Sequence, residues 1–134
     1  MSEIKTYRDL IAWQKAMTLA EQVYVMTREM PGDERFGLTA QMRRAAVSIP
    51  SNIAEGHARQ GREFANYLSI ALGSAAEIET QLLLGVEFGY LTEADLAPVV
   101  DLLTEVRRMA SAIINRITSP KPPPPTGSDL TPDP

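Results

Sequence analysis

The chain has 134 residues, no cysteine and a formal net charge of −4 at pH 7. This length fits one domain with a sizeable core, and the lack of cysteine excludes disulfide frameworks, thiolate metal sites and thiol catalysis. The acidic balance has the wrong sign for nucleic-acid binding over the whole surface. No run approaches the roughly 20 apolar residues of a membrane span, so we expect a cytoplasmic protein that does not enter the membrane.

Helical periodicity begins at about Tyr7 and continues to Met30, where Pro31 ends it. Apolar residues at spacings of three and four form two adjacent stripes on this segment. The first stripe is Leu10, Trp13, Met17, Ala20 and Tyr24, and the second is Ala16, Leu19, Val23, Met26 and Met30. Two stripes are more apolar surface than one neighbouring helix covers, and such a surplus usually marks an interface.

A second helix is expected from about Phe36 to His57 or just beyond, with Pro50 inside it. Proline removes one amide donor and crowds the carbonyl of Ala46, so we predict a kink here. The apolar register continues past the proline to Gly56, which favours a kinked helix over a break. Three polar side chains lie close enough to bond the freed backbone groups: Ser48, Ser51 and Asn52.

Two further helices follow in the chain. One is predicted from about Glu63 to Gly89, and the small residues in its middle let a neighbouring helix come close. Thr92 is a capping residue, and the acidic turn after it suits the start of a fourth helix that ends near Ile117. Long helices joined by short connections favour an antiparallel up-down-up-down four-helix bundle over residues 1–118.

Residues 119–134 have a different composition, with four consecutive prolines from Pro122 to Pro125. Proline-rich sequence cannot be helical, and this stretch has almost nothing apolar to bury, so we predict a disordered, extended tail. The alternative is that the tail is a ligand for a proline-recognising domain.

Reactive side chains are few, so we predict no enzyme, no metal and no cofactor. His57 is the only histidine, and the sequence lacks the paired Glu-x-x-His motifs of di-metal helical bundles. Glu77 and Glu79 are two residues apart on a helix and point to different faces, which does not suit acid–base catalysis. No strand-to-helix turn presents a serine as a nucleophile.

Charge is segregated along the chain. Between Arg35 and Arg62 there are five arginines against the single acid Glu55, whereas the third predicted helix has four glutamates and no lysine or arginine. These charges can neutralise each other within one chain, or meet between copies and set their orientation. The arginines can also line a surface for an anionic ligand. The candidate contacts with a partner or nucleic acid are Arg43, Arg44, Arg59 and Arg62.

Three stretches resemble the bacterial four-helix bundle proteins named for open reading frames in intervening sequences of 23S ribosomal RNA genes. These are residues 9–17, 36–56 and 73–82, and the similarity extends over about residues 7–117. The central stretch contains a structural motif formed by Ser48, Pro50, Asn52, Glu55 and Gly56. The resemblance implies an antiparallel bundle that assembles into a ring-like homopentamer without catalytic activity.

The chain also looks like the accessory protein of diversity-generating retroelements, which shares the bundle and the pentamer and binds a reverse transcriptase and nucleic acid through a basic surface. Those relatives are basic, whereas this chain is acidic. Two functions therefore stay open. The first is a non-enzymatic homo-oligomeric scaffold or binding module for a protein partner. The second is an RNA- or DNA-binding accessory protein that uses a basic patch on the second helix.

Overall fold

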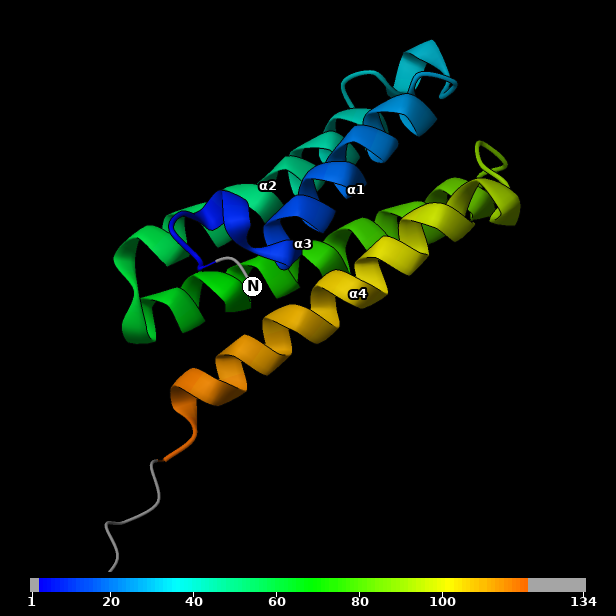
Figure 1. Cartoon of the computed structure of the whole chain (residues 1–134). Helices are drawn as coiled ribbons and strands as arrows, with labels where there is room; N and C mark the ends of the chain where they lie inside the picture. The colour runs from blue at the N-terminus through cyan, green and yellow to red at the C-terminus, as the bar shows by residue number, and fades with distance from the viewer. Residues whose placement is uncertain (1–2, 121–134) are drawn as a thin grey trace, which may run out of the picture.

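The computed structural model describes residues 3–120, which fold into an all-α bundle of four long helices without a strand (Figure 1). The long helices are α1 (Ile11–Thr27), α2 (Leu38–Arg59), α3 (Gly61–Glu87) and α4 (Glu93–Thr118), and two short 3-10 turns are η1 (Tyr7–Asp9) and η2 (Gly32–Glu34). The predicted fold class is confirmed. Of the tail predicted over residues 119–134, all but the first two residues lie outside the described range.

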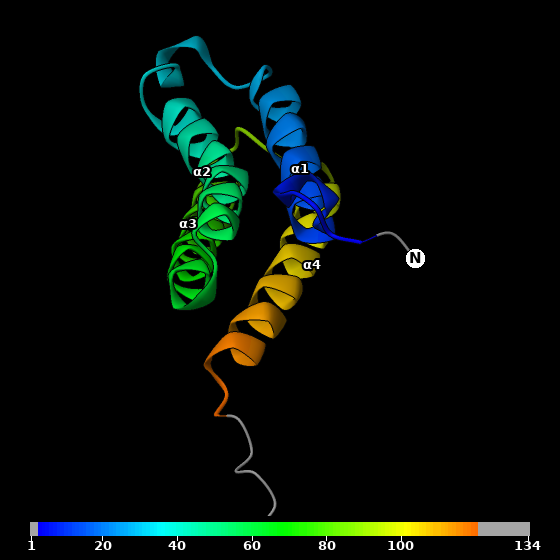
Figure 2. The same ribbon diagram turned by 60° about the vertical axis from the view of Figure 1, so that its left-hand side comes forward.

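Each long helix packs against two neighbours, in the order α1, α2, α3, α4 and back to α1 (Figure 2). The contact between α2 and α3 is the most extensive. The largest fully buried side chains come from all four helices and form one core: Leu19, Met42, Ile49, Ile53, Leu68, Ile78, Leu82 and Leu103. Within residues 3–120, no helix is long and apolar enough to cross a membrane.

The first helix is shorter than the predicted segment from Tyr7 to Met30. The Asp9 carboxylate accepts from the backbone N–H of Thr6 at 3.0 Å, and the Thr6 hydroxyl accepts from the N–H of Arg8 at 3.2 Å. This capping box holds η1 as a separate turn. Leu10 is then extended, with ψ 124°, so α1 begins only at Ile11 and ends at Thr27.

The two apolar stripes of α1 have different environments. The second stripe belongs to the core, and its Ala16, Leu19 and Val23 are fully buried. The first stripe is left partly open, since Met17 and Tyr24 are 38% and 39% exposed. The second stripe therefore packs in the core, whereas the first is buried only at Leu10 and is otherwise partly open within this chain.

Helix α2 continues without a break through Pro50, so its predicted continuity is confirmed, while the kink stays a prediction. Ser51 Oγ donates to the Val47 carbonyl and Asn52 Nδ2 donates to the Ser48 carbonyl, each at 2.8 Å. These bonds reach the carbonyls beside the one that proline leaves without a donor. The polar side chains therefore support the helix next to Pro50 and do not replace its missing bond.

Candidate binding surface

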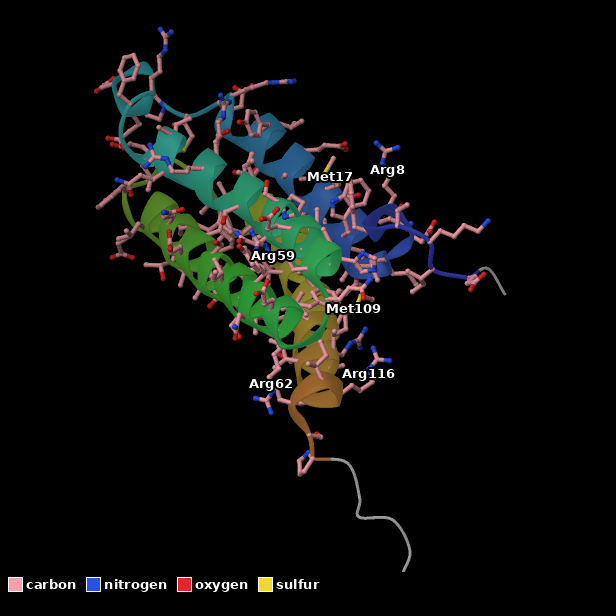
Figure 3. All side chains as sticks on the ribbon, turned by 90° about the vertical axis from the view of Figure 1, so that its left-hand side faces the viewer. Arg8, Met17, Arg59, Arg62, Met109 and Arg116 are labelled. Atoms are coloured by element: carbon pink, nitrogen blue, oxygen red, sulfur yellow. The ribbon has the colours of Figure 1, made fainter. Side chains whose placement is uncertain are left out.

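A groove of about 580 Å³ lies between α1 and α2 on the outside of the bundle. Tyr7 lines it beside the start of α1 and Arg28 lines it after the end of α1, so the groove follows that whole helix. Apolar side chains from both helices make most of its wall: Trp13, Met17, Tyr24, Val47, Pro50 and Ala54. Met17 projects from α1 on this side of the molecule (Figure 3).

Aromatic rings are the most distinctive part of the groove. Tyr7 and Trp13 meet edge to face, with ring centroids 5.2 Å apart. Tyr24 follows Trp13 by eleven residues, about three helical turns, and so lies on the same side of α1. Among residues 3–120, the indole N–H of Trp13 and the hydroxyls of Tyr7 and Tyr24 form no hydrogen bond. The wall therefore combines flat apolar rings with unused donors.

Arg43 holds the far end of this groove together. Its Nε donates to Thr27 Oγ1 at 2.8 Å, its Nη2 donates to the Tyr24 carbonyl at 3.4 Å, and its guanidinium carbon is 4.5 Å from the centroid of the Tyr24 ring. A cation is favourable here because the carbonyls at the end of α1 carry the negative pole of the helix dipole. Arg43 is thus a structural link from α2 to α1.

Arg59 is also engaged within the chain. It is paired with Glu55 at 3.0 Å and with Glu63 at 3.3 Å, and it stacks over the Tyr67 ring at 5.3 Å. Hydrogen bonds to Glu55 first, and then to Glu63, raise the pKa of Arg59 above its ordinary value. All three charged side chains are solvent-exposed, so the pairs position Arg59 but add little stability.

The structure does not gather the four predicted arginines into one patch. Arg59 follows Arg43 by sixteen residues on α2, a distance of about 24 Å along the helix. Arg44 and Arg62 are exposed and have no acidic partner among residues 3–120. Arg62 lies at the end of the bundle where α4 finishes, together with Arg116 (Figure 3). The four predicted arginines are thus spread along α2 and the start of α3.

The predicted structural motif on α2 makes contacts beyond its own helix. Ser48 Oγ is 2.8 Å from Ser74 Oγ of α3, and Asn52 Nδ2 donates to Ser48 Oγ at 2.8 Å. This network joins the two helices at a place where Ser74 is buried. The signal that could have found it is Ser74 itself, a polar residue within a stretch of small apolar ones.

Gly56 of this motif packs closely against α3. A Cβ atom on Gly56 would lie 2.7 Å from the Cβ of Tyr67 and 3.2 Å from the backbone carbonyl oxygen of Phe64. Atoms this close cannot be accommodated without moving a helix. Glycine is therefore required here by packing, at the end of α2 that leads into the turn to α3.

His57 packs against an aromatic side chain. It is half-buried, and its ring meets Phe64 edge to face with centroids 5.6 Å apart. Within the described range of 3–120, no group of three or more His, Cys, Asp or Glu side chains is arranged to hold a metal ion. The chemistry that this surface offers is apolar contact and hydrogen bonding.

These features define a four-helix bundle with an aromatic groove on one side. Residues 8–112 match the family model described as 23S rRNA-intervening sequence protein. This match spans well over half of the chain and includes α1, α2, α3 and most of α4. The chain belongs to the family of 23S rRNA-intervening sequence proteins, as the sequence resemblance predicted.

A solved structure supports the same assignment. It is the crystal structure of a protein with unknown function from the S23 ribosomal protein family of Bacteroides thetaiotaomicron. The two chains are 28% identical, the TM-score is 0.70, and the similarity covers 78% of this chain and 96% of the other. The comparison with curated proteins gives no match.

Proposed function

We propose that this chain is a non-enzymatic protein that assembles with copies of itself into a pentamer and serves as a scaffold for a protein partner. Two exposed apolar side chains on one outer face of α3 carry the proposal. Ile70 is 51% exposed and Leu84 is 40% exposed, and they are fourteen residues apart, close to four helical turns, so they lie on one face. Large apolar side chains that share an exposed face are typical of an interface.

Charge on the same surface supports contact between copies. Glu77 lies between Ile70 and Leu84 on this face of α3, and it has no cationic partner among residues 3–120. Arg44 on α2 is exposed and equally without an acid in that range. A ring needs a head-to-tail contact between two different surfaces. An α3 face with Glu77 and an α2 face with Arg44 are complementary in charge for such a contact.

Light scattering tests the assembly. We expect the wild type at micromolar concentration to have a mass several times the 14.7 kDa of one chain, and Leu84→Glu to lower that mass while circular dichroism stays unchanged. Leu83→Glu is the matched control, because Leu83 is 60% exposed but about 100° away around the helix. A monomeric wild type, or assembly that survives both substitutions, would contradict the proposal.

Nucleic-acid binding is the second candidate, and the exposed, unpaired Arg44 and Arg62 favour it. In a ring, repeated copies of these side chains would act together and strengthen a feeble single-site affinity. We expect only weak RNA binding at about 150 mM salt, because phosphate contacts are screened there and the chain is acidic. Sub-micromolar binding that Arg44→Glu/Arg62→Glu abolishes, with the assembly state kept, would favour this second function. Arg43 is left intact because it holds α1.

A further inference from the structure

The groove between α1 and α2 has the chemistry of a surface that binds proline-rich sequence. Proline-rich segments form polyproline II helices, whose carbonyls have no internal hydrogen bonds. Such segments dock into grooves lined by aromatic rings, where prolines pack on the rings and carbonyls accept from Trp or Tyr donors. Tyr7, Trp13 and Tyr24 supply three rings along this groove, and their polar groups are unused within residues 3–120.

The chain carries a ligand of this kind itself. Five of the six residues from Pro120 to Pro125 are proline. We propose that residues 121–134 bind in the α1–α2 groove of their own chain, with the prolines against Tyr7 and Trp13. This inference does not depend on self-assembly. The disordered tail predicted from the sequence is the alternative outcome of the experiment below.

The segment starts at the correct end of the bundle. A second hollow, of about 700 Å³, is lined by Ile113 and Arg116 near the end of α4 and by Asp9 and Ile11 near the start of α1. Asp9 and Tyr7 belong to the same 3-10 turn, η1. Figure 1 shows η1 and the last turns of α4 at one end of the molecule. The described chain therefore ends at the same end of the bundle as η1 and its Tyr7.

The segment is also long enough. Its fourteen residues span about 43 Å as a polyproline II helix, at about 3.1 Å per residue. The groove from Trp13 to Arg28 is about 22 Å long, because fifteen residues of α-helix rise by that distance. With Pro125 against Trp13, the five residues after Pro120 provide about 16 Å for the path around the N-terminal end of α1, and the nine residues after Pro125, about 28 Å, span the groove.

Charge favours this direction of binding. Asp133 follows Pro125 by eight residues, about 25 Å when extended, which brings it level with Arg28 at the far end of the groove. Glu21 is the one carboxylate among the lining residues, and because it is exposed, as Arg28 is, salt screens its repulsion of Asp129 and the attraction between Arg28 and Asp133 alike. The opposite direction would place the acids at the aromatic end, away from Arg28.

Trp13 reports directly on this groove because it is the only tryptophan in the chain. The experiment compares acrylamide quenching of Trp13 fluorescence in the full chain and in a chain that ends at Pro120. We expect truncation to raise the quenching constant about twofold and to shift the emission to longer wavelength, since a docked segment covers the exposed part of the ring. Equal quenching in the two chains would overturn the proposal.

Two further samples make the result specific. A full-length variant with Pro122, Pro123, Pro124 and Pro125 all changed to Ser should behave like the truncated chain, and protection that survives this change would overturn recognition of the prolines. The second sample refolds truncated chains together with an excess of full-length Trp13→Phe chains. We expect no protection there, and protection of Trp13 by the tail of another copy would overturn the same-chain assignment. Both readouts apply to a monomer as well as to an oligomer.

Discussion

Gly56→Ala tests the close packing of α2 on α3. The added Cβ would lie 2.7 Å from Tyr67 Cβ, 3.0 Å from Phe64 Cδ1 and 3.2 Å from the Phe64 carbonyl oxygen. Carbon atoms in contact are ordinarily about 3.5–4.0 Å apart. Neither Tyr67 Cβ nor the Phe64 carbonyl can rotate away, because both are fixed to the backbone of α3. The two helices must therefore separate by nearly 1 Å at their most extensive contact.

The expected loss of stability follows from two opposing effects. Overpacking a core costs about 1–3 kcal/mol, while replacing glycine by alanine inside a helix gains about 0.5–1 kcal/mol. We expect a net loss of about 1–2 kcal/mol, which for a domain of this size lowers Tm by about 3–10 °C. Thermal unfolding followed by circular dichroism at one fixed protein concentration measures the change, since assembly makes Tm depend on concentration.

Gly32→Ala is the matched control for this prediction. Nothing lies within 4 Å of a Cβ on Gly32, so alanine there should stabilise the protein slightly by restricting the unfolded chain. Gly85→Ala should be intermediate, because the atom nearest its Cβ is Leu91 Cδ1 at 2.7 Å, the end of a side chain that can move. A Gly56→Ala protein as stable as the wild type would refute the close packing of α2 on α3.

Three other predictions concern single residues. Pro50→Ala should keep the helical circular dichroism and Tm within a few degrees, since alanine restores the donor to the Ala46 carbonyl; lost helicity would show that the proline is required. Gln60→Gly should raise the stability in denaturant by about 1 kcal/mol, because Gln60 has φ 63° and ψ 174°, a region that favours glycine; an unchanged midpoint would contradict this strain. The backbone N–H of Thr92 donates to the Asp95 carboxylate. This bond, followed by a hydrogen bond with the Thr92 side chain, holds the pKa of Asp95 below its ordinary value of 3.8. Its stabilising contribution is therefore present above that pH and lost as pH falls through the lowered pKa, so denaturation of Asp95→Asn should differ from wild type at neutral pH and converge with it in acid. A difference that grows in acid would reverse the assigned sign.

Local signals in the sequence were sufficient for most helix ends. The Thr92 cap lies where predicted, and α2 passes through Pro50 as its register indicated. The start of α1 was wrong because Thr6 and Asp9 form a capping box that was not recognised. That Thr-x-x-Asp spacing is present in the sequence, so the start of α1 is encoded locally.

The candidate site was predictable only as a set of residues. The sequence grouped Arg43, Arg44, Arg59 and Arg62 by charge, but charge does not say which side chain has a partner across a helix interface. Arg43 bonds Thr27 and the Tyr24 carbonyl of α1, contacts sixteen or more residues away in the chain. The link from Ser48 to Ser74 is of the same kind, since it joins residues twenty-six positions apart.

The sequence by itself determined the helical class, the number of helices and the family, because periodicity, caps and prolines act over a few residues. Only the tertiary structure decided which apolar stripe of α1 is core. Trp13 and Leu19 each belong to an apolar stripe, yet Leu19 is fully buried and Trp13 lines an open groove. Periodicity assigns a side chain to a face of its own helix, whereas burial depends on where the neighbouring helices cross that face.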